Sequence, residues 1–75
     1  MRTNTAKQML LTGNPAIGAV AALVSPWSAE ILSQSGYDWI LLDTQHGFWS
    51  PDSVRSAVVA ILRGEAAPMA RVAIN

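Results

Sequence analysis

Residues 36–43 read GYDWILLD, and this stretch decides the fold because a continuous apolar run lies between a glycine and an aspartate. Parallel strands that are covered on both faces lose the alternation of polar and apolar residues, as Trp39 to Leu42 do. Successive parallel strands are joined by crossover connections, which are usually helices. The stretch therefore predicts a buried parallel strand with a helix on either side of it in the sequence.

Two serine-proline pairs mark helix starts on the two sides of this strand. Ser25-Pro26 precedes the strand and Ser50-Pro51 follows it, and serine suits the N-cap while proline suits the first helical position. The first of these helices is expected over 26–35, with three apolar side chains toward the core: Trp27, Ile31 and Leu32. The second is predicted to be amphipathic, since its apolar residues recur three and four positions apart. These residues are Val54, Ala57, Val58, Ile61 and Leu62.

Three further elements complete an alternating pattern. A short helix is expected over 5–12, a strand over 17–23 and a last strand over 69–74. A glycine follows each predicted helix, where the left-handed C′ position favours it: Gly13, Gly36 and Gly64. The order α-β-α-β-α-β predicts parallel βαβ units and hence an α/β fold. Periodicity alone leaves open whether the sheet is doubly wound or part of a barrel.

The composition limits the class of protein. The 75 residues form one small domain at most, are 51% hydrophobic and 13% charged, and carry no net charge. Soluble domains typically carry about 25% charged residues, so we expect apolar surface that meets a partner or a missing remainder. The neutral balance gives no support to nucleic-acid binding, and no apolar stretch approaches the roughly 20 residues of a membrane span. The absence of cysteine is consistent with a cytoplasmic protein.

Polar residues fall where the chemistry of α/β folds is found, at the carboxyl ends of the strands. Asp43 ends the central strand, His46 follows three residues later, and Arg71 lies in the last strand between apolar neighbours. We expect Arg71 to lie among buried groups and to pair with Asp43, because a lone buried guanidinium is costly.

Each of these residues also has a structural interpretation. Asp43 is of a type that caps the turn after a strand, His46 of a type that is often solvated in a loop, and Arg71 of a type that forms structural ion pairs. Trp49 is more typical of packing than of binding. The sequence contains no nucleotide-binding glycine motif, metalloprotease motif or nucleophile elbow.

The motifs together resemble the HpcH/HpaI family of class II, metal-dependent pyruvate aldolases. The resemblance rests on residues 28–32, on residues 36–47 with their D-x-x-H spacing, on the arginine-bearing residues 68–72 and on residues 13–18. It extends from about Met9 to the last residue. It implies that residues 1–75 are the N-terminal fragment of a single (β/α)8 barrel domain, holding the leading helix and about two and a half βα units.

The resemblance also implies a reaction, the cleavage of 4-hydroxy-2-oxo acids to pyruvate and an aldehyde with Mg²⁺, Mn²⁺ or Co²⁺. Arg71 matches the arginine that stabilises charge on the keto oxygen, His46 the residue that handles the proton, and Asp43 the carboxylate that orients that histidine. Gln45 stands where the family usually has glutamate. The family's metal-ligating residues are expected beyond Asn75, so we expect neither metal ligands nor cofactor-binding residues in this chain.

From the same resemblance we expect a cytoplasmic homo-oligomer that acts on a small 2-oxo acid and binds neither nucleic acid nor membrane. The isolated 75 residues are expected to be inactive. Two alternatives stay open. One is a citrate-lyase-like acyl-CoA lyase, and the other is a non-enzymatic remnant or small α/β interaction module, which predicts a monomer with a cooperative thermal transition.

Overall fold

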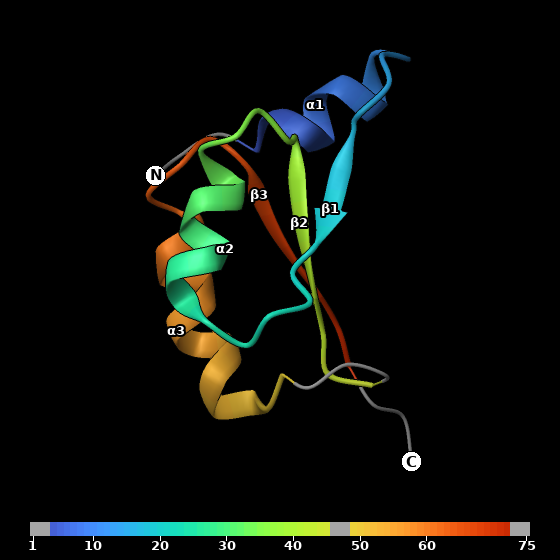
Figure 1. The fold of residues 1–75 in the computed structure, drawn as a ribbon. Helices are drawn as coiled ribbons and strands as arrows, with labels where there is room; N and C mark the ends of the chain where they lie inside the picture. Colours follow the sequence, from blue (N-terminus) through green and yellow to red (C-terminus); the bar gives the residue numbers. More distant parts are fainter. Residues whose placement is uncertain (1–3, 46–48, 73–75) are drawn as a thin grey trace.

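The computed structural model describes residues 4–45 and 49–72, and the three helices and three strands alternate in the predicted order. Figure 1 shows the chain, and the elements have the following bounds. They are α1 (Thr5–Leu11), β1 (Gly18–Val20), α2 (Pro26–Ser33), β2 (Trp39–Asp43), α3 (Pro51–Ile61) and β3 (Ala67–Arg71).

The strands form one parallel sheet in the order β1-β2-β3. Both crossover helices, α2 and α3, lie side by side on one face of the sheet, and α1 lies near the end where the strands begin (Figure 1). The predicted α/β class and the parallel strands are confirmed. A barrel and one half of a doubly wound sheet share this arrangement, so three strands alone do not separate the two folds.

The helix starts follow the predicted chemistry with one difference. Ser50 forms a capping box with Ser53, in which each side chain bonds to the other residue's backbone N–H. Ser25 is also an N-cap residue in front of a proline, but its side chain makes no capping bond. The start of α3 is thus fixed by a capping box, whereas the start of α2 relies on Pro26 and on the Ser28 hydroxyl, which donates to the carbonyl oxygen of Ser25 at 3.0 Å.

The predicted left-handed glycines are confirmed at two of the three positions. Gly13 has φ +82° and Gly36 has φ +99°, but Gly64 does not have a positive φ. Gly64 instead lies so close to Ser33 that a Cβ atom there would overlap the serine side chain and backbone. The reason for glycine at position 64 is therefore close packing between the ends of α2 and α3.

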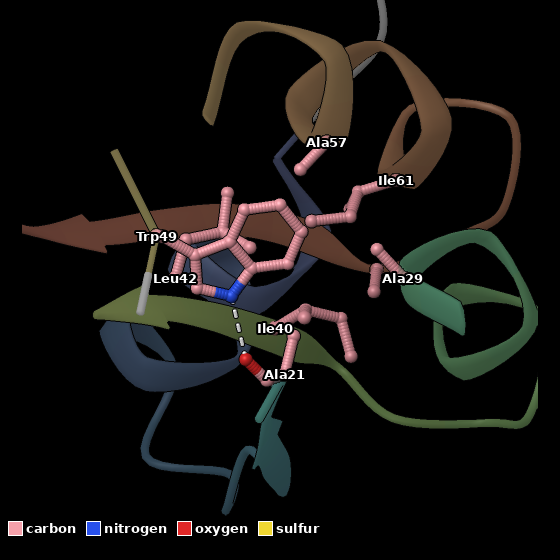
Figure 2. Packing of buried hydrophobic residues seen from close by; sticks show 8 residues of the cluster. Ala21, Ala29, Ile40, Leu42, Trp49, Ala57 and Ile61 are labelled. Carbon is pink, nitrogen blue, oxygen red and sulfur yellow. Dashed lines mark hydrogen bonds between the residues drawn. The ribbon is translucent and has the colours of Figure 1, made fainter. Parts of the chain in front are cut away.

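The core lies between the sheet and the two crossover helices (Figure 2). Ile40 and Leu42 of β2 and Ile61 of α3 are fully buried. Trp49 packs into the same cluster and is only 4% exposed, which confirms its packing role. Small residues complete the cluster on the facing elements: Ala21, Ala29, Ala57 and Ala66.

The predicted core face of α2 is wrong for Trp27 and Ile31, whereas Leu32 packs against the core. Trp27 is 76% exposed and Ile31 is 63% exposed, while Leu32 is half-buried. The buried residues of this helix are Ala29 and Ser33. Small side chains on that face let α2 lie close to β2 and α3, and the large apolar side chains point away as a result.

The remaining boundaries differ by a few residues. The predicted helices over 5–12 and 26–35 end slightly earlier, and the strand predicted over 17–23 forms only at Gly18–Val20. The strand predicted over 69–74 is in fact Ala67–Arg71, since Ala67 is already in register with Trp39. Leu62, predicted on the buried face of α3, is the C-cap residue and is 48% exposed.

Alternation along β2 and β3 defines a second, open face of the sheet. Trp39, Leu41 and Asp43 lie opposite the helices, in register with Ala67, Met69 and Arg71. The apolar run of β2 is therefore buried on one face only, because Trp39 and Leu41 are half-buried. A groove of about 570 Å³ separates this face from α1 near the start of the strands. Asp43 and Arg71 lie at the other end of the same face.

Candidate functional site

Asp43 and Arg71 are the last residues of β2 and β3, and they are direct register partners. The pairing of neighbouring parallel strands brings together two residues that lie 28 positions apart in the sequence. Both side chains project from the open face of the sheet, because register partners in a parallel sheet point to the same side. The two residues therefore form the centre of the candidate site.

The two side chains form a two-point ion pair. Arg71 Nε donates a hydrogen bond to Asp43 Oδ1 at 3.1 Å, and Arg71 Nη2 donates to Asp43 Oδ2. This fork geometry is the strongest that an arginine makes with a carboxylate, and it fixes the plane of the guanidinium. The pairing predicted from the sequence is confirmed.

The predicted burial of Arg71 is wrong, since its side chain is 49% exposed while that of Asp43 is 11% exposed. The described element that lies against the open face, α1, contacts it near the start of the strands and not at the end where Arg71 lies. The hydrogen bond to Asp43 raises the pKa of Arg71, and the attraction between the two charges adds to this shift. Arg71 is therefore a permanent cation whose orientation is set by Asp43.

The guanidinium keeps hydrogen-bonding capacity beyond this pair. Asp43 engages Nε and Nη2, and Nη1 of Arg71 has no hydrogen-bond partner among residues 4–45 and 49–72. A fixed cation with an unused N–H donor suits an oxyanion or a carboxylate on a small ligand.

The turn after β2 adds contacts that the sequence analysis did not single out. The backbone N–H of Gln45 donates to Asp43 Oδ1 at 2.9 Å. Thr44 donates its backbone N–H and its hydroxyl to the carbonyl oxygen of Arg71, at 2.9 Å and 2.6 Å. The only sequence signal for Thr44 is that it directly follows Asp43, the residue of β2 that pairs with Arg71 at the end of β3.

His46 lies outside the described residues, so its place beside Asp43 stays a prediction. The chain is described again from Trp49, whose indole Nε1 donates to the carbonyl oxygen of Ala21 at 2.6 Å (Figure 2). Gln45 and Trp49, on the two sides of His46 in the sequence, thus both contact residues at the carboxyl ends of strands.

Three carboxylates away from this end have structural roles. Asp38 accepts the backbone N–H of Ile17 at 2.7 Å and so joins the beginnings of β1 and β2. Glu30 pairs with Arg63 at 3.3 Å across α2 and α3. Asp52 lies in the first turn of α3, where a negative charge is favourable. None of these three carboxylates lies at the site formed by Asp43 and Arg71.

The described residues do not fit a metal site. No group of three or more His, Cys, Asp or Glu side chains within residues 4–45 and 49–72 could hold a metal ion. Asp43, the carboxylate at the site, is already bonded to a guanidinium. No helix in the described part of the chain is long and apolar enough to cross a membrane.

No family model matches this chain. The sequence is, however, similar to known enzymes. It is 39% identical over 70 residues to hydroxypyruvate/pyruvate aldolase of Deinococcus radiodurans, and the aligned region covers 93% of this chain and 24% of the relative. It is 35% identical over 72 residues to 4-hydroxy-2-oxo-heptane-1,7-dioate aldolase of Escherichia coli, and the aligned region covers 96% of this chain and 28% of the relative. The chain therefore spans about a quarter of the length of the curated relatives it matches.

Solved structures give the same result for the fold. Citrate synthase SbnG matches 95% of this chain and 29% of its own with a TM-score of 0.83; at 24% identity this likeness shows the fold alone. An HpcH/HpaI aldolase/citrate lyase family protein from Burkholderia cenocepacia matches 91% of this chain and 27% of its own, with a TM-score of 0.72 and 30% identity. Three strands alone fit either a barrel or a doubly wound sheet. These matches favour the barrel, since the matching structures belong to barrel-type proteins of the aldolase/citrate lyase family.

Proposed function

Because this chain belongs to the HpcH/HpaI aldolase family, we propose that it forms the first quarter of a barrel that cleaves 4-hydroxy-2-oxo acids to pyruvate and an aldehyde. The observation that carries this proposal is the ion pair of Asp43 and Arg71 at the carboxyl ends of two neighbouring strands. Enzymes built on parallel barrels place their reacting groups at this end. The similarity to proteins named as aldolases supports the reaction class.

The reaction places specific demands on these residues. Breaking the bond between C3 and C4 of the substrate releases the aldehyde and leaves the electron pair on an enolate of pyruvate, whose negative charge lies largely on the keto oxygen. A guanidinium fixed beside that oxygen stabilises the charge as it develops, and fixed donors are effective because they need no reorganisation. In this proposal Arg71 supplies the cation and Asp43 holds its plane.

A proton must also move. The hydroxyl group on C4 loses its proton as the bond breaks, and C3 of the enolate gains one to give pyruvate. We assign this transfer to His46, directly or through a water molecule, because imidazole titrates near neutral pH. The assignment rests on the D-x-x-H spacing between Asp43 and His46.

The divalent cation expected for this family has no ligand set among the described residues. From the resemblance we propose that the ligands of this cation lie beyond Asn75. When bound, such a cation supplies Lewis-acid polarisation of the keto group. We also propose, from the resemblance alone, that the whole protein is a homo-oligomer.

The proposal is tested with a chimera in which residues 4–72 of this chain replace the aligned segment of the Deinococcus radiodurans aldolase. Pyruvate release from a 4-hydroxy-2-oxo acid is measured with excess divalent metal. We expect an active chimera in which Arg71→Lys lowers kcat by about 10²–10³-fold, the usual effect of losing one charge-stabilising donor.

The matched control is Arg55→Lys, since Arg55 is an exposed arginine on α3. It is expected to leave kcat within about twofold, as surface substitutions usually do. A folded chimera that releases no pyruvate, or one in which the two arginine substitutions have equal effects, would refute the proposed function.

A further inference from the structure

We propose that Thr44 is a positioning residue for Arg71, and that it holds the backbone from which the guanidinium extends. This inference rests on the proposed function and deepens it by naming a residue that the family resemblance did not assign. Asp43 fixes the charged end of Arg71, and Thr44 fixes the other end of the same residue.

Thr44 makes two hydrogen bonds to the last residue of the neighbouring strand. Its backbone N–H and its hydroxyl both donate to the carbonyl oxygen of Arg71, at 2.9 Å and 2.6 Å. A carbonyl oxygen has two lone pairs, so Thr44 supplies a donor for each. The hydroxyl bond links two neighbouring strands rather than residues of one turn, because the partners lie 27 positions apart.

The position of these bonds explains why they matter. Arg71 is the last residue of β3, and strand ends open more readily than strand centres. After Thr44 the chain leaves the sheet, since the next backbone N–H, that of Gln45, turns back to Asp43. Within residues 4–45 and 49–72, the two bonds of Thr44 are therefore the hydrogen bonds farthest along between β2 and β3 at the candidate site.

Loss of the hydroxyl is expected to loosen the backbone of Arg71 while leaving the ion pair chemically intact. Valine keeps the branched shape of threonine and the backbone bond, whereas serine keeps the hydroxyl. One hydrogen bond contributes up to about a tenfold effect, and misplacement of a reacting group lowers kcat more than it raises KM.

The kinetic test uses the chimera described above. Thr44→Val is expected to lower kcat about fivefold to tenfold with KM within about twofold, and Thr44→Ser to restore kcat to within about twofold. In the Arg71→Lys background, Thr44→Val is expected to have a clearly smaller effect, since coupled residues are not additive. Equal effects of Thr44→Val in both backgrounds would overturn the inference.

The matched control is Thr12→Val, because the Thr12 hydroxyl also bonds to backbone carbonyl oxygens, those of Gln8 and Met9 at the end of α1. It is expected to leave kcat within about twofold. An equal loss in Thr12→Val and Thr44→Val would show a general effect on stability and would contradict a positioning role.

A second measurement separates this inference from the proposed function. The exchange rate of the Arg71 Nε proton, followed by NMR in the folded chimera, does not depend on turnover. We expect it to rise about tenfold in Thr44→Val and to stay unchanged in Thr44→Ser and Thr12→Val. An inactive chimera with this pattern refutes the aldolase proposal and keeps the role of Thr44, whereas unchanged exchange in Thr44→Val refutes that role.

Discussion

The indole Nε1 of Trp49 donates a hydrogen bond to the carbonyl oxygen of Ala21 over 2.6 Å, in the buried core. Ala21 directly follows β1, and Trp49 lies in the connection between β2 and α3. The bond therefore joins the segment after β1 to the segment after β2. The side chain thereby combines packing against Leu42 and Ala57 with the satisfaction of a buried carbonyl (Figure 2). It also fixes one end of the stretch that contains His46.

We predict that Trp49→Phe destabilises the chimera by about 1–3 kcal/mol, because the smaller ring leaves a gap and the carbonyl of Ala21 loses its donor. Trp27→Phe is the matched control, since Trp27 is 76% exposed, and it is expected to change stability by less than about 0.5 kcal/mol. Urea unfolding followed by circular dichroism measures both. Similar losses in the two variants would show that Trp49 has no special role.

We predict that Gly64→Ala is more damaging than Gly13→Ala. A Cβ at position 64 would overlap Ser33, whereas a Cβ at position 13 would meet nothing within 4 Å and would suffer only from the positive φ of +82°. The expected loss is about 1–2 kcal/mol for Gly13→Ala and at least about 3 kcal/mol for Gly64→Ala, where the backbone must shift as well. Thermal unfolding of the two chimeras compares them, and the reverse order would contradict the close packing of α2 and α3.

The pH dependence of the site follows from the direction of one pKa shift. Pairing with Asp43 raises the pKa of Arg71 in the folded state. The stability that this group contributes is therefore fully present below its unfolded pKa, and it is lost only as pH rises through the still higher folded pKa, far above neutral pH. Between about pH 6 and pH 9 neither arginine nor lysine titrates. We expect the same shape of log kcat against pH in the unsubstituted and Arg71→Lys chimeras, and a new limb in the variant would contradict a constant charge at this position.

We predict that the isolated 75 residues release no pyruvate from a 4-hydroxy-2-oxo acid, with or without added divalent metal. The described residues lack a metal ligand set, and Arg71 lies on a face that is open to solvent, where a charge stabilises an enolate poorly. The measurement is a coupled assay of pyruvate, with His46→Ala as the background control. Activity above that control would show that the rest of the barrel is dispensable.

The order of the elements followed from local signals in the sequence. Proline after serine fixed the starts of α2 and α3, and the apolar run of β2 located the central strand. The pairing of Asp43 with Arg71 was also predictable, because neighbouring parallel strands bring their carboxyl ends together. These features depend on residues close in sequence or on a rule of topology.

Which side chains are buried depends on how closely two elements approach each other, and local sequence patterns do not predict that distance. The apolar pattern of α2 favoured Trp27 and Ile31 as core residues, but the close approach of α2 to the sheet selected Ala29 and Ser33 instead. The left-handed conformation predicted for Gly64 is wrong for the same kind of reason, since its contact with Ser33 joins segments about 30 residues apart. The burial of Arg71 was overestimated because its apolar sequence neighbours, Ala70 and Val72, are themselves exposed.

The register of β3 against β2 has a consequence for misfolding. A slip of one residue would place Ala70 or Val72 opposite Asp43 and would turn the arginine to the opposite face of the sheet, because side chains alternate between the faces of a strand. That arrangement would separate the guanidinium from the carboxylate and leave the largely buried Asp43 side chain without its arginine partner. The ion pair thus favours the observed register over its one-residue neighbours, since only the observed register brings the guanidinium to the Asp43 carboxylate.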